Sequence, residues 1–324
     1  MKTIHELQQM IDDEIRKQDR IPEPPELYEP ISYTLSNGGK RLRPVFVLLG
    51  CQLFSDEVEK AVKPALGIEM FHNFTLLHDD IMDKAFVRRN LPTVHIKWDV
   101  NRAILSGDAL AIRSNLFISA CDREVLPEVL DVFNHTALHV CEGQQFDLNF
   151  ERREKVSVNE YLRMIHLKTA VLIAGSLQIG ALIGGAEKTW AREVYTMGNS
   201  IGMAFQLQDD YLDTFGQADT FGKNIGGDIL SDKKTFLLIK ALEIGNAVEV
   251  ETLKRLYSGK AIPPEEKIDT VLGIFRKLGI DELTKEKVRH YSNEALDILR
   301  KIPVEEARKT ELEAFTRDLI NRVR

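Results

Sequence analysis

Hydrophobic positions recur at helical spacing along nearly the whole chain, and no stretch shows the two-residue alternation of a half-buried strand. Leu7, Ile11 and Ile15 mark a first amphipathic helix. A connector with three prolines at 21–26 separates it from a second helix, which ends near the glycines at 38–39. The pattern predicts further helices over 44–53, 60–84, 92–120, 126–147, 158–185, 190–215, 232–244, 247–257, 262–279 and 281–301, and a last one that runs to the end. The sequence therefore predicts an all-α protein.

Two of these predicted helices carry the same acidic pattern, Asp-Asp-x-x-Asp. The first copy is Asp79, Asp80 and Asp83, and the second is Asp209, Asp210 and Asp213. On a helix, offsets of one and four residues keep three carboxylates within about 100° of arc. Carboxylates that face one cavity repel each other unless cations separate them, and Mg²⁺ with oxygen ligands bridges readily to phosphates. The pattern predicts a magnesium site for a phosphorylated ligand.

The two acidic motifs are about 130 residues apart, and one domain is the simplest way to bring them together. No repeat, low-complexity tract or shift in composition marks a domain boundary. We therefore expect a large single-domain helical bundle over residues 1–324, built around a central cavity.

Basic residues and glycines lie near both motifs. They are the run Gly38-Gly39-Lys40-Arg41-Leu42-Arg43, the pair Arg88-Arg89, Lys168 with Thr169, and Lys223 and Lys233 around a glycine-rich loop. Each basic residue alone is most simply a surface charge. Together they supply what two diphosphates need, because arginine makes forked contacts with phosphate oxygens and glycine allows close backbone approach.

Composition narrows the class of protein. A net charge of −7 without a long basic run argues against a nucleic-acid partner. The polar stretch 1–18 is not a secretory signal, and three cysteines without metal-type spacing are typical of small core residues in a reducing compartment. Thr169 to Ala186 carries no charge, but its glycines and polar residues favour a buried helix over a membrane span. We expect a cytoplasmic protein.

The chain resembles the trans-isoprenyl diphosphate synthases, the group that includes farnesyl and geranylgeranyl diphosphate synthases. The resemblance covers nearly the whole chain, with the motifs in the family's order and spacing. They are Gly-Gly-Lys-Arg-x-Arg-Pro at 38–44, the first acidic motif with Arg88-Arg89, Gly107-Asp108, Gly143-Gln144 with Asp147, Lys168-Thr169, Phe205-Gln206 with the second acidic motif, Gly222-Lys223, and Gly227-Asp228 with Lys233. One departure is Asn90, where glycine is common.

The resemblance implies an isoprenoid synthase fold and a Mg²⁺-assisted condensation. Isopentenyl diphosphate joins an allylic diphosphate (dimethylallyl, geranyl or farnesyl) in this reaction. It implies three Mg²⁺ ions on the allylic diphosphate, with Asp79, Asp80, Asp83 and Asp209 as ligands and Asp210 and Asp213 acting through water. Arg88, Lys168, Lys223 and Lys233 would hold the same diphosphate, and Lys168, Thr169 and Gln206 would lie near the carbocation. Isopentenyl diphosphate would bind Lys40, Arg43, His72 and Arg89 without a metal. Relatives are homodimers, so we expect a homodimer.

Product length depends on residues before the first motif. Phe74 lies five residues before Asp79, about 7.5 Å back along the helix axis, and Phe71 lies one turn deeper. In the family, a bulky residue at that depth closes the chain pocket, and the insertion typical of bacterial farnesyl synthases is absent here. We expect a C15 or C20 product. Both phenylalanines also fit an ordinary core.

Three other functions are compatible with parts of the sequence pattern. A terpene cyclase shares the fold but normally has one Asp-rich motif and no second diphosphate pocket. A regulatory subunit of a synthase pair usually lacks one acidic motif. A di-metal carboxylate bundle needs Glu-x-x-His pairs, which the chain does not present in register. Incorporation of labelled isopentenyl diphosphate separates a synthase from all three.

Overall fold

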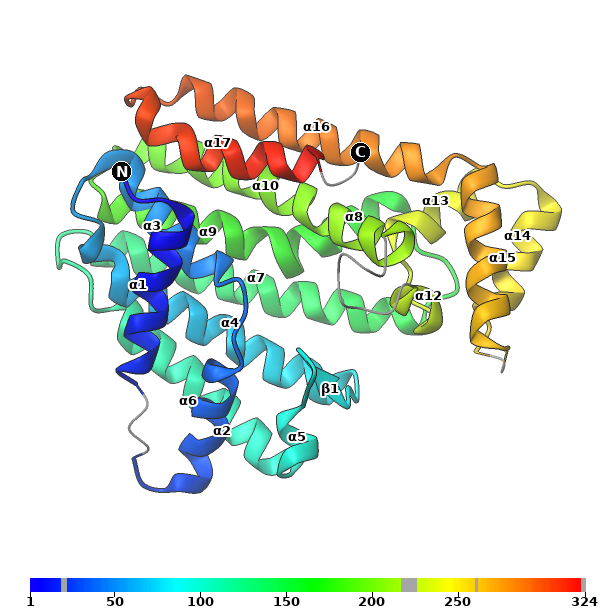
Figure 1. Ribbon diagram of the computed structural model, residues 1–324, viewed down its shortest axis with the longest axis horizontal. Coiled ribbons are helices and arrows are strands. Elements are labelled where there is room, and N and C mark those ends of the chain that lie inside the picture. Colours follow the sequence, from blue (N-terminus) through cyan, green and yellow to red (C-terminus); the bar gives the residue numbers. More distant parts are fainter. Residues whose placement is uncertain (19–21, 217–225, 260–261, 322–324) are drawn as a thin grey trace. The chain divides into compact units, whose positions relative to one another are not determined.

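The computed structural model describes residues 1–18, 22–216, 226–259 and 262–321, and the regular secondary structure of this part is helical apart from one short hairpin (Figure 1). The all-α prediction is confirmed. The elements are α1 Ile4–Arg16, α2 Pro25–Ser36, α3 Leu42–Phe54, η1 Val58–Ala61, α4 Val62–Met82, β1 Val87–Arg88, β2 Leu91–Pro92, α5 Val94–Lys97, α6 Val100–Ile118, α7 Leu126–Arg152, α8 Val158–Ile165, η2 His166–Ala170, α9 Val171–Ile183, α10 Lys188–Phe215, α12 Gly227–Leu230, α13 Phe236–Ile244, α14 Ala247–Leu256, α15 Pro264–Lys277, α16 Ile280–Lys301 and α17 Glu306–Asn321.

Contacts divide the chain into two compact units. Unit 1 contains Met1–His135, Gly175–Tyr195 and Pro303–Glu311, and unit 2 contains Thr136–Ala174, Thr196–Ile302 and Leu312–Arg324. The single domain over residues 1–324 stays a prediction.

In unit 1, α4 packs chiefly against α6 and also against α1 and α3 (blue to cyan in Figure 1). The first helix begins with a capping box, in which Thr3 and Glu6 satisfy each other's backbone N–H groups. Its apolar stripe is fully packed, because Leu7 and Ile11 are 0% exposed and Ile15 is 5% exposed. These three residues attach α1 to the rest of the unit.

The uncharged stretch that raised the question of a membrane span is a core helix in this structure. Val158–Ile183 is long and apolar enough to cross a bilayer, yet 83% of its most apolar window is buried in the protein. Glycines explain how it packs: a Cβ on Gly180 would lie 1.9 Å from the Val47 carbonyl oxygen, and one on Gly50 would lie 2.2 Å from the Leu177 carbonyl oxygen. The backbones of α3 and α9 therefore touch, which larger side chains would prevent.

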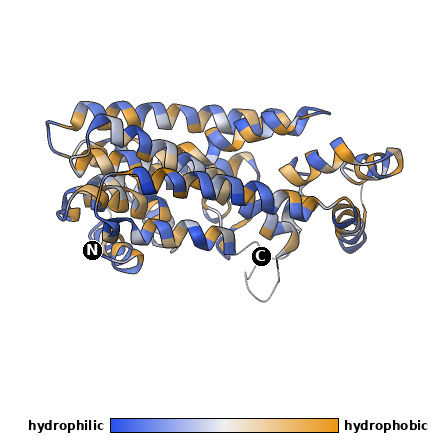
Figure 2. Cartoon of the chain, turned by 90° about the horizontal axis from the view of Figure 1, so that it is seen from above, coloured by the Kyte–Doolittle hydropathy of each residue, from blue (hydrophilic) through white to orange (hydrophobic). Residues whose placement is uncertain are grey.

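Unit 2 has its own apolar cluster. Leu237, Leu253, Val271, Phe275 and Ile280 are each at most 1% exposed and join α13, α14, α15 and α16. Figure 2 shows hydrophilic and hydrophobic residues interleaved along most helices, as expected for helices that are buried on one face.

Several predicted boundaries were wrong. The helix predicted over 92–120 is divided: β2 ends at Pro92, the short helix α5 follows, and α6 begins only after Asp99, which caps the N–H of Arg102. The helix predicted over 232–244 starts at Phe236, because Asp232 has a φ of 56° and interrupts the helix. The cysteines were not all core residues: Cys51 is buried, whereas Cys141 is exposed.

Candidate active site

The first acidic motif lies at the C-terminal end of α4. Asp79 and Asp80 belong to the last turn, and exposed Asp83 is the residue that caps the helix end. Arg88 Nε donates to Asp80 Oδ1 at 2.7 Å, and Arg88 Nη2 lies 3.5 Å from Asp79 Oδ2. Burial raises the pKa of Asp80, and the charge of Arg88 opposes that shift. One guanidinium thus compensates two neighbouring carboxylates.

A hairpin directly after the motif presents this arginine. Val87 pairs with Pro92 and Arg88 with Leu91, so Arg89 and Asn90 form a two-residue turn. Their φ angles are 53° and 63°, the left-handed pair of a type I′ turn. Asparagine is among the few residues other than glycine that adopt this conformation readily. Asn90 can therefore form this turn, at a position where the family commonly has glycine.

The glycine-rich loop before α3 lies against the same hairpin. Arg89 Nη1 donates to the Gly38 carbonyl oxygen, and Gly39 has a φ of 128°, which favours glycine at this position. Arg43 Nη1 lies 3.1 Å from His72 Nε2. Burial, followed by the charges of Arg43 and Arg89, lowers the pKa of His72 well below its ordinary value. The arginines around His72 make this part of unit 1 positive, so it suits an anion.

The second acidic motif lies in the last two turns of α10, within unit 2. Asp209 is exposed, whereas Asp210 is 3% exposed. The Tyr161 hydroxyl donates to Asp210 Oδ2, and Gln206 Nε2 donates to Asp210 Oδ1 at 2.9 Å. Burial, and then the charge of Asp228, raises the pKa of Asp210 to about 8. Neutral hydrogen-bond donors hold this carboxyl group.

Lys168 and Thr169 lie in a π-helical turn, η2, between α8 and α9. A wider turn of this kind is frequent at functional sites. Lys168 Nζ donates to Asp147 Oδ2 at 2.6 Å, and Thr169 Oγ1 donates to Gln206 Oε1 at 2.9 Å. A Cβ on Gly143 would lie 2.3 Å from the Lys168 nitrogen, so glycine on α7 makes room for the turn. The predicted continuous helix over 158–185 contains this local change of winding.

The last members of the site lie around Asp213. Its Oδ2 accepts from the Asp228 backbone N–H at 2.8 Å, and its carbonyl oxygen accepts from the Gly226 N–H at 2.7 Å. Lys233 Nζ lies 4.0 Å from Asp228 Oδ1. These contacts connect α10 with the segment that carries Lys233. Lys223 lies outside the described residues.

The predicted site residues fall into two sets. Unit 1 contains Lys40, Arg43, Phe71, His72, Phe74, Asp79, Asp80, Asp83, Arg88 and Arg89, and unit 2 contains Lys168, Thr169, Gln206, Asp209, Asp210, Asp213 and Lys233. Sequence reasoning missed Tyr161, which is 3% exposed and contacts Asp210 directly. Its spacing of seven residues from Lys168, two helical turns, was the signal that could have identified it.

Fold and site together define a class: all-α proteins with two aspartate-rich helix ends and clustered basic side chains suited to diphosphates. The family model for polyprenyl synthetase matches residues 24–275. The chain belongs to the polyprenyl synthetase family, as its motifs predicted.

The chain is also similar to proteins whose names state an activity. A geranylgeranyl diphosphate synthase from Methanosarcina mazei is 35% identical over 288 residues, covering 87% of each chain. A geranylfarnesyl diphosphate synthase from Natronomonas pharaonis is 32% identical and covers 94% of this chain and 93% of its own. A crystal structure of a geranylgeranyl pyrophosphate synthase superposes with a TM-score of 0.94 at 41% identity, covering 99% of both chains.

Proposed function

We propose that the protein is a trans-prenyltransferase that condenses isopentenyl diphosphate with an allylic diphosphate and makes a C20 prenyl diphosphate for isoprenoid biosynthesis. The family match over residues 24–275 supports the reaction class, and the geranylgeranyl names of similar proteins favour C20. The observation that carries the proposal is that both acidic motifs are intact. Arg88 binds the first motif directly in unit 1, and in unit 2 Thr169, next to Lys168, bonds to Gln206, which holds Asp210 of the second motif.

The reaction begins when the allylic C–O bond breaks and the diphosphate leaves with the electron pair. Arg88 and Lys168 would bind the departing diphosphate, together with Lys233 and Lys223, and stabilise its growing negative charge. The hydrogen bond from Thr169 to Gln206 orients oxygens that would stabilise the allylic cation. The double bond of isopentenyl diphosphate then forms the new C–C bond, and a proton passes to the released diphosphate. No protein base is needed.

The residues fit a magnesium cofactor. Asp79 keeps 19% of its side chain exposed, and Asp83 and Asp209 are exposed, so hard oxygen donors are accessible in both motifs. Within the described residues no three acidic, histidine or cysteine side chains form a metal site by themselves, so substrate oxygens would have to complete the coordination. Three Mg²⁺ ions bound with the diphosphate would neutralise the leaving group.

Isopentenyl diphosphate would bind the positive cluster of unit 1. Lys40 is exposed, and Arg43, His72 and Arg89 are connected to the same loop through the contacts described above. Arginine suits this role because its guanidinium makes two parallel bonds to a phosphate group. No carboxylate of the first motif is needed to bind this substrate.

Labelled isopentenyl diphosphate tests the function. With Mg²⁺ and each of the C5, C10 and C15 allylic primers, we expect incorporation and a C20 product by chromatography, and loss of activity with EDTA. Products that stop at C15 or extend beyond C20 would refute the proposed length and leave the reaction intact. No incorporation with any primer would refute the synthase and favour a cyclase or a regulatory subunit.

Aromatic packing supports Phe74 as the residue that limits product length. The ring centroids of Phe71 and Phe74 are 5.5 Å apart, and Phe71 lies 5.5 Å from Phe133. The ring centroids of Phe74 and His78 are 4.8 Å apart, and Gly107 leaves room for the histidine ring because it has no side chain. Buried Phe71 and Phe133 would keep Phe74 in place against a growing chain.

Replacing Phe74 tests this limit. Phe74→Ala is expected to lengthen the main product by at least one C5 unit, because the truncated side chain leaves space for further methylenes. Phe71→Ala alone should change the product less, since Phe74 still closes the pocket. Product chromatography of both variants measures this, and an unchanged chain length in Phe74→Ala would refute the role.

A homodimer is the proposed assembly. Leu105, Ile112 and Leu116 are 59%, 65% and 66% exposed and lie along one face of α6. A second copy of the chain would cover this apolar stripe. Light scattering should give twice the chain mass, and Ile112→Asp should lower it toward that of one chain. A single-chain mass for the unmodified protein would refute the dimer.

A further inference from the structure

Arg41 stands between two residues proposed to bind a diphosphate, yet its own side chain is 4% exposed. All three guanidinium nitrogens have protein partners. Nε donates to Asp12 Oδ1 at 3.2 Å, Nη1 to Glu69 Oε1 at 2.6 Å, and Nη2 to the Leu35 carbonyl oxygen at 2.5 Å. Arg41 therefore acts within the protein framework, unlike its exposed neighbour Lys40.

The backbone of Arg41 explains why such contacts are needed. Its φ of 48° and ψ of 31° are left-handed, and it immediately precedes the first residue of α3. This conformation is strained for an L-residue and persists only where the surroundings hold it. It sets the direction in which Lys40 leaves the loop and the position from which Arg43 starts. The buried ion pair with Glu69 holds the turn from the α4 side.

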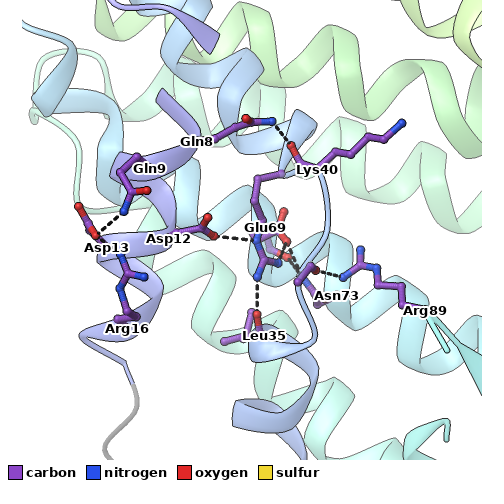
Figure 3. A network of polar contacts seen from close by, with 12 residues as sticks. Gln8, Gln9, Asp12, Asp13, Arg16, Leu35, Lys40, Glu69, Asn73 and Arg89 are labelled. Atoms are coloured by element: carbon purple, nitrogen blue, oxygen red, sulfur yellow. Dashed lines mark hydrogen bonds and ion pairs between the residues drawn. The ribbon is translucent and has the colours of Figure 1, made fainter. Parts of the chain in front are cut away.

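The first helix holds the same turn from its other side. Gln8 Nε2 donates to the Lys40 carbonyl oxygen at 2.7 Å (Figure 3), and Asp12 accepts from Arg41 Nε. Gln8 and Asp12 are four residues apart and so share one face of α1. The adjacent stripe of α1, Gln9 with Asp13 and Asp13 with Arg16, bonds only along the helix in Figure 3. Gln8 and Asp12 therefore contact the loop, whereas the stripe next to them is bonded within α1.

We propose that α1 is a positioning element for the isopentenyl diphosphate pocket, with Gln8 and Asp12 holding the 38–43 loop so that Lys40 and Arg43 meet the diphosphate. The inference rests on the proposed function of those two cations. The Asp12 carboxylate is 44% exposed, so its contribution is modest, and the two contacts act together. The allylic diphosphate, which is assigned to other residues, should not depend on them.

The test is a double variant, Gln8→Ala with Asp12→Ala, beside the matched control Gln9→Ala with Asp13→Ala on the same helix. The first pair should raise the KM for isopentenyl diphosphate about threefold to tenfold, the range expected for one or two lost hydrogen bonds. The KM for the allylic primer should stay within about twofold, and the Tm of both double variants should match the wild type within about 2 °C. The control should change neither KM.

Calorimetric titration of isopentenyl diphosphate without Mg²⁺ gives a second readout without turnover, and its Kd should rise by the same factor. An unchanged KM and Kd, an equal rise for both substrates, or an equal effect of the control pair would each overturn the inference. Those outcomes leave the synthase proposal standing. A wild-type protein that neither binds nor incorporates isopentenyl diphosphate would refute the proposed function itself.

Discussion

The two acidic motifs share one sequence pattern and differ in what holds them. In both, the middle aspartate is buried, with Asp80 6% and Asp210 3% exposed. Asp80 is paired with the cation Arg88, which opposes the rise in pKa that burial causes. Asp210 is held by the neutral donors Tyr161 and Gln206, and nearby Asp228 adds to the rise in its pKa. A repeated motif therefore does not imply a repeated electrostatic environment.

The aspartates within each motif also differ in exposure, and this difference assigns them two roles. Asp79 and Asp209 are more accessible than the residues that follow them, so they suit a metal. Asp80 and Asp210 hold their helix ends to neighbouring elements, through an ion pair in one unit and through hydrogen bonds in the other. Both tasks need carboxylates, and the pattern Asp-Asp-x-x-Asp conceals the distinction.

The largest effect should come from removing the first aspartate of either motif. Asp79→Ala and Asp209→Ala should each lower kcat by about 10³-fold, because the charge that develops on the diphosphate would lose a metal-binding group. Steady-state kinetics with labelled isopentenyl diphosphate measures this, with Asp131→Ala on the exposed surface as control. Wild-type kcat in only one of the two variants would show that the motifs do not act as a pair.

A smaller effect on kcat should distinguish Arg88, the partner of Asp80, from Tyr161, the partner of Asp210. Arg88→Gln should lower kcat about 10²-fold, since Arg88 would lose contact both with the motif and with the diphosphate. Tyr161→Phe should lower kcat only about tenfold and should lower the free energy of unfolding by about 1–3 kcal/mol, because one bond to a buried carboxyl group is lost. Kinetics and denaturant unfolding of both variants provide the comparison. A larger loss of kcat in Tyr161→Phe would reverse the assigned roles.

The smallest expected effect is on the pH dependence of stability, and it comes from the positive charges around His72. Burial, Arg43 and Arg89 lower the pKa of His72 below the value of 6.5 that it has when unfolded. The stability from neutral His72 is therefore present above about pH 6.5 and falls as the pH drops below it toward the folded-state pKa. His72→Asn should reduce the loss of Tm between pH 7.5 and pH 5.5 by on the order of 2 °C.

His135→Asn, at a position whose side chain is 68% exposed, provides the comparison for this measurement. An equal change in both variants would mean that the pH dependence does not come from the field around His72.

Helical spacing was sufficient to predict the fold class, because an apolar stripe with a period near 3.6 is a local property of the sequence. Most helices lie within a few residues of their predicted ranges. The break at Asp99 was missed, since it depends on a single cap within a pattern that continues on both sides, and the late start of α13 was missed because Asp232 is left-handed. The π-helical turn at Lys168 was missed for another reason: it requires Gly143, which lies on a different helix.

The sequence by itself determined the family and predicted the chemical type of the site and the residues that could bind metal and diphosphate, because these follow from residue identity and spacing. Only the tertiary structure decided which carboxylates and cations are already engaged. Arg41, Lys40 and Arg43 are similar cations within four residues, yet Arg41 is buried on Asp12 and Glu69. Asp80 and Asp210 are identical residues with different partners. Burial and partners come from segments distant in the chain, so local sequence does not encode them.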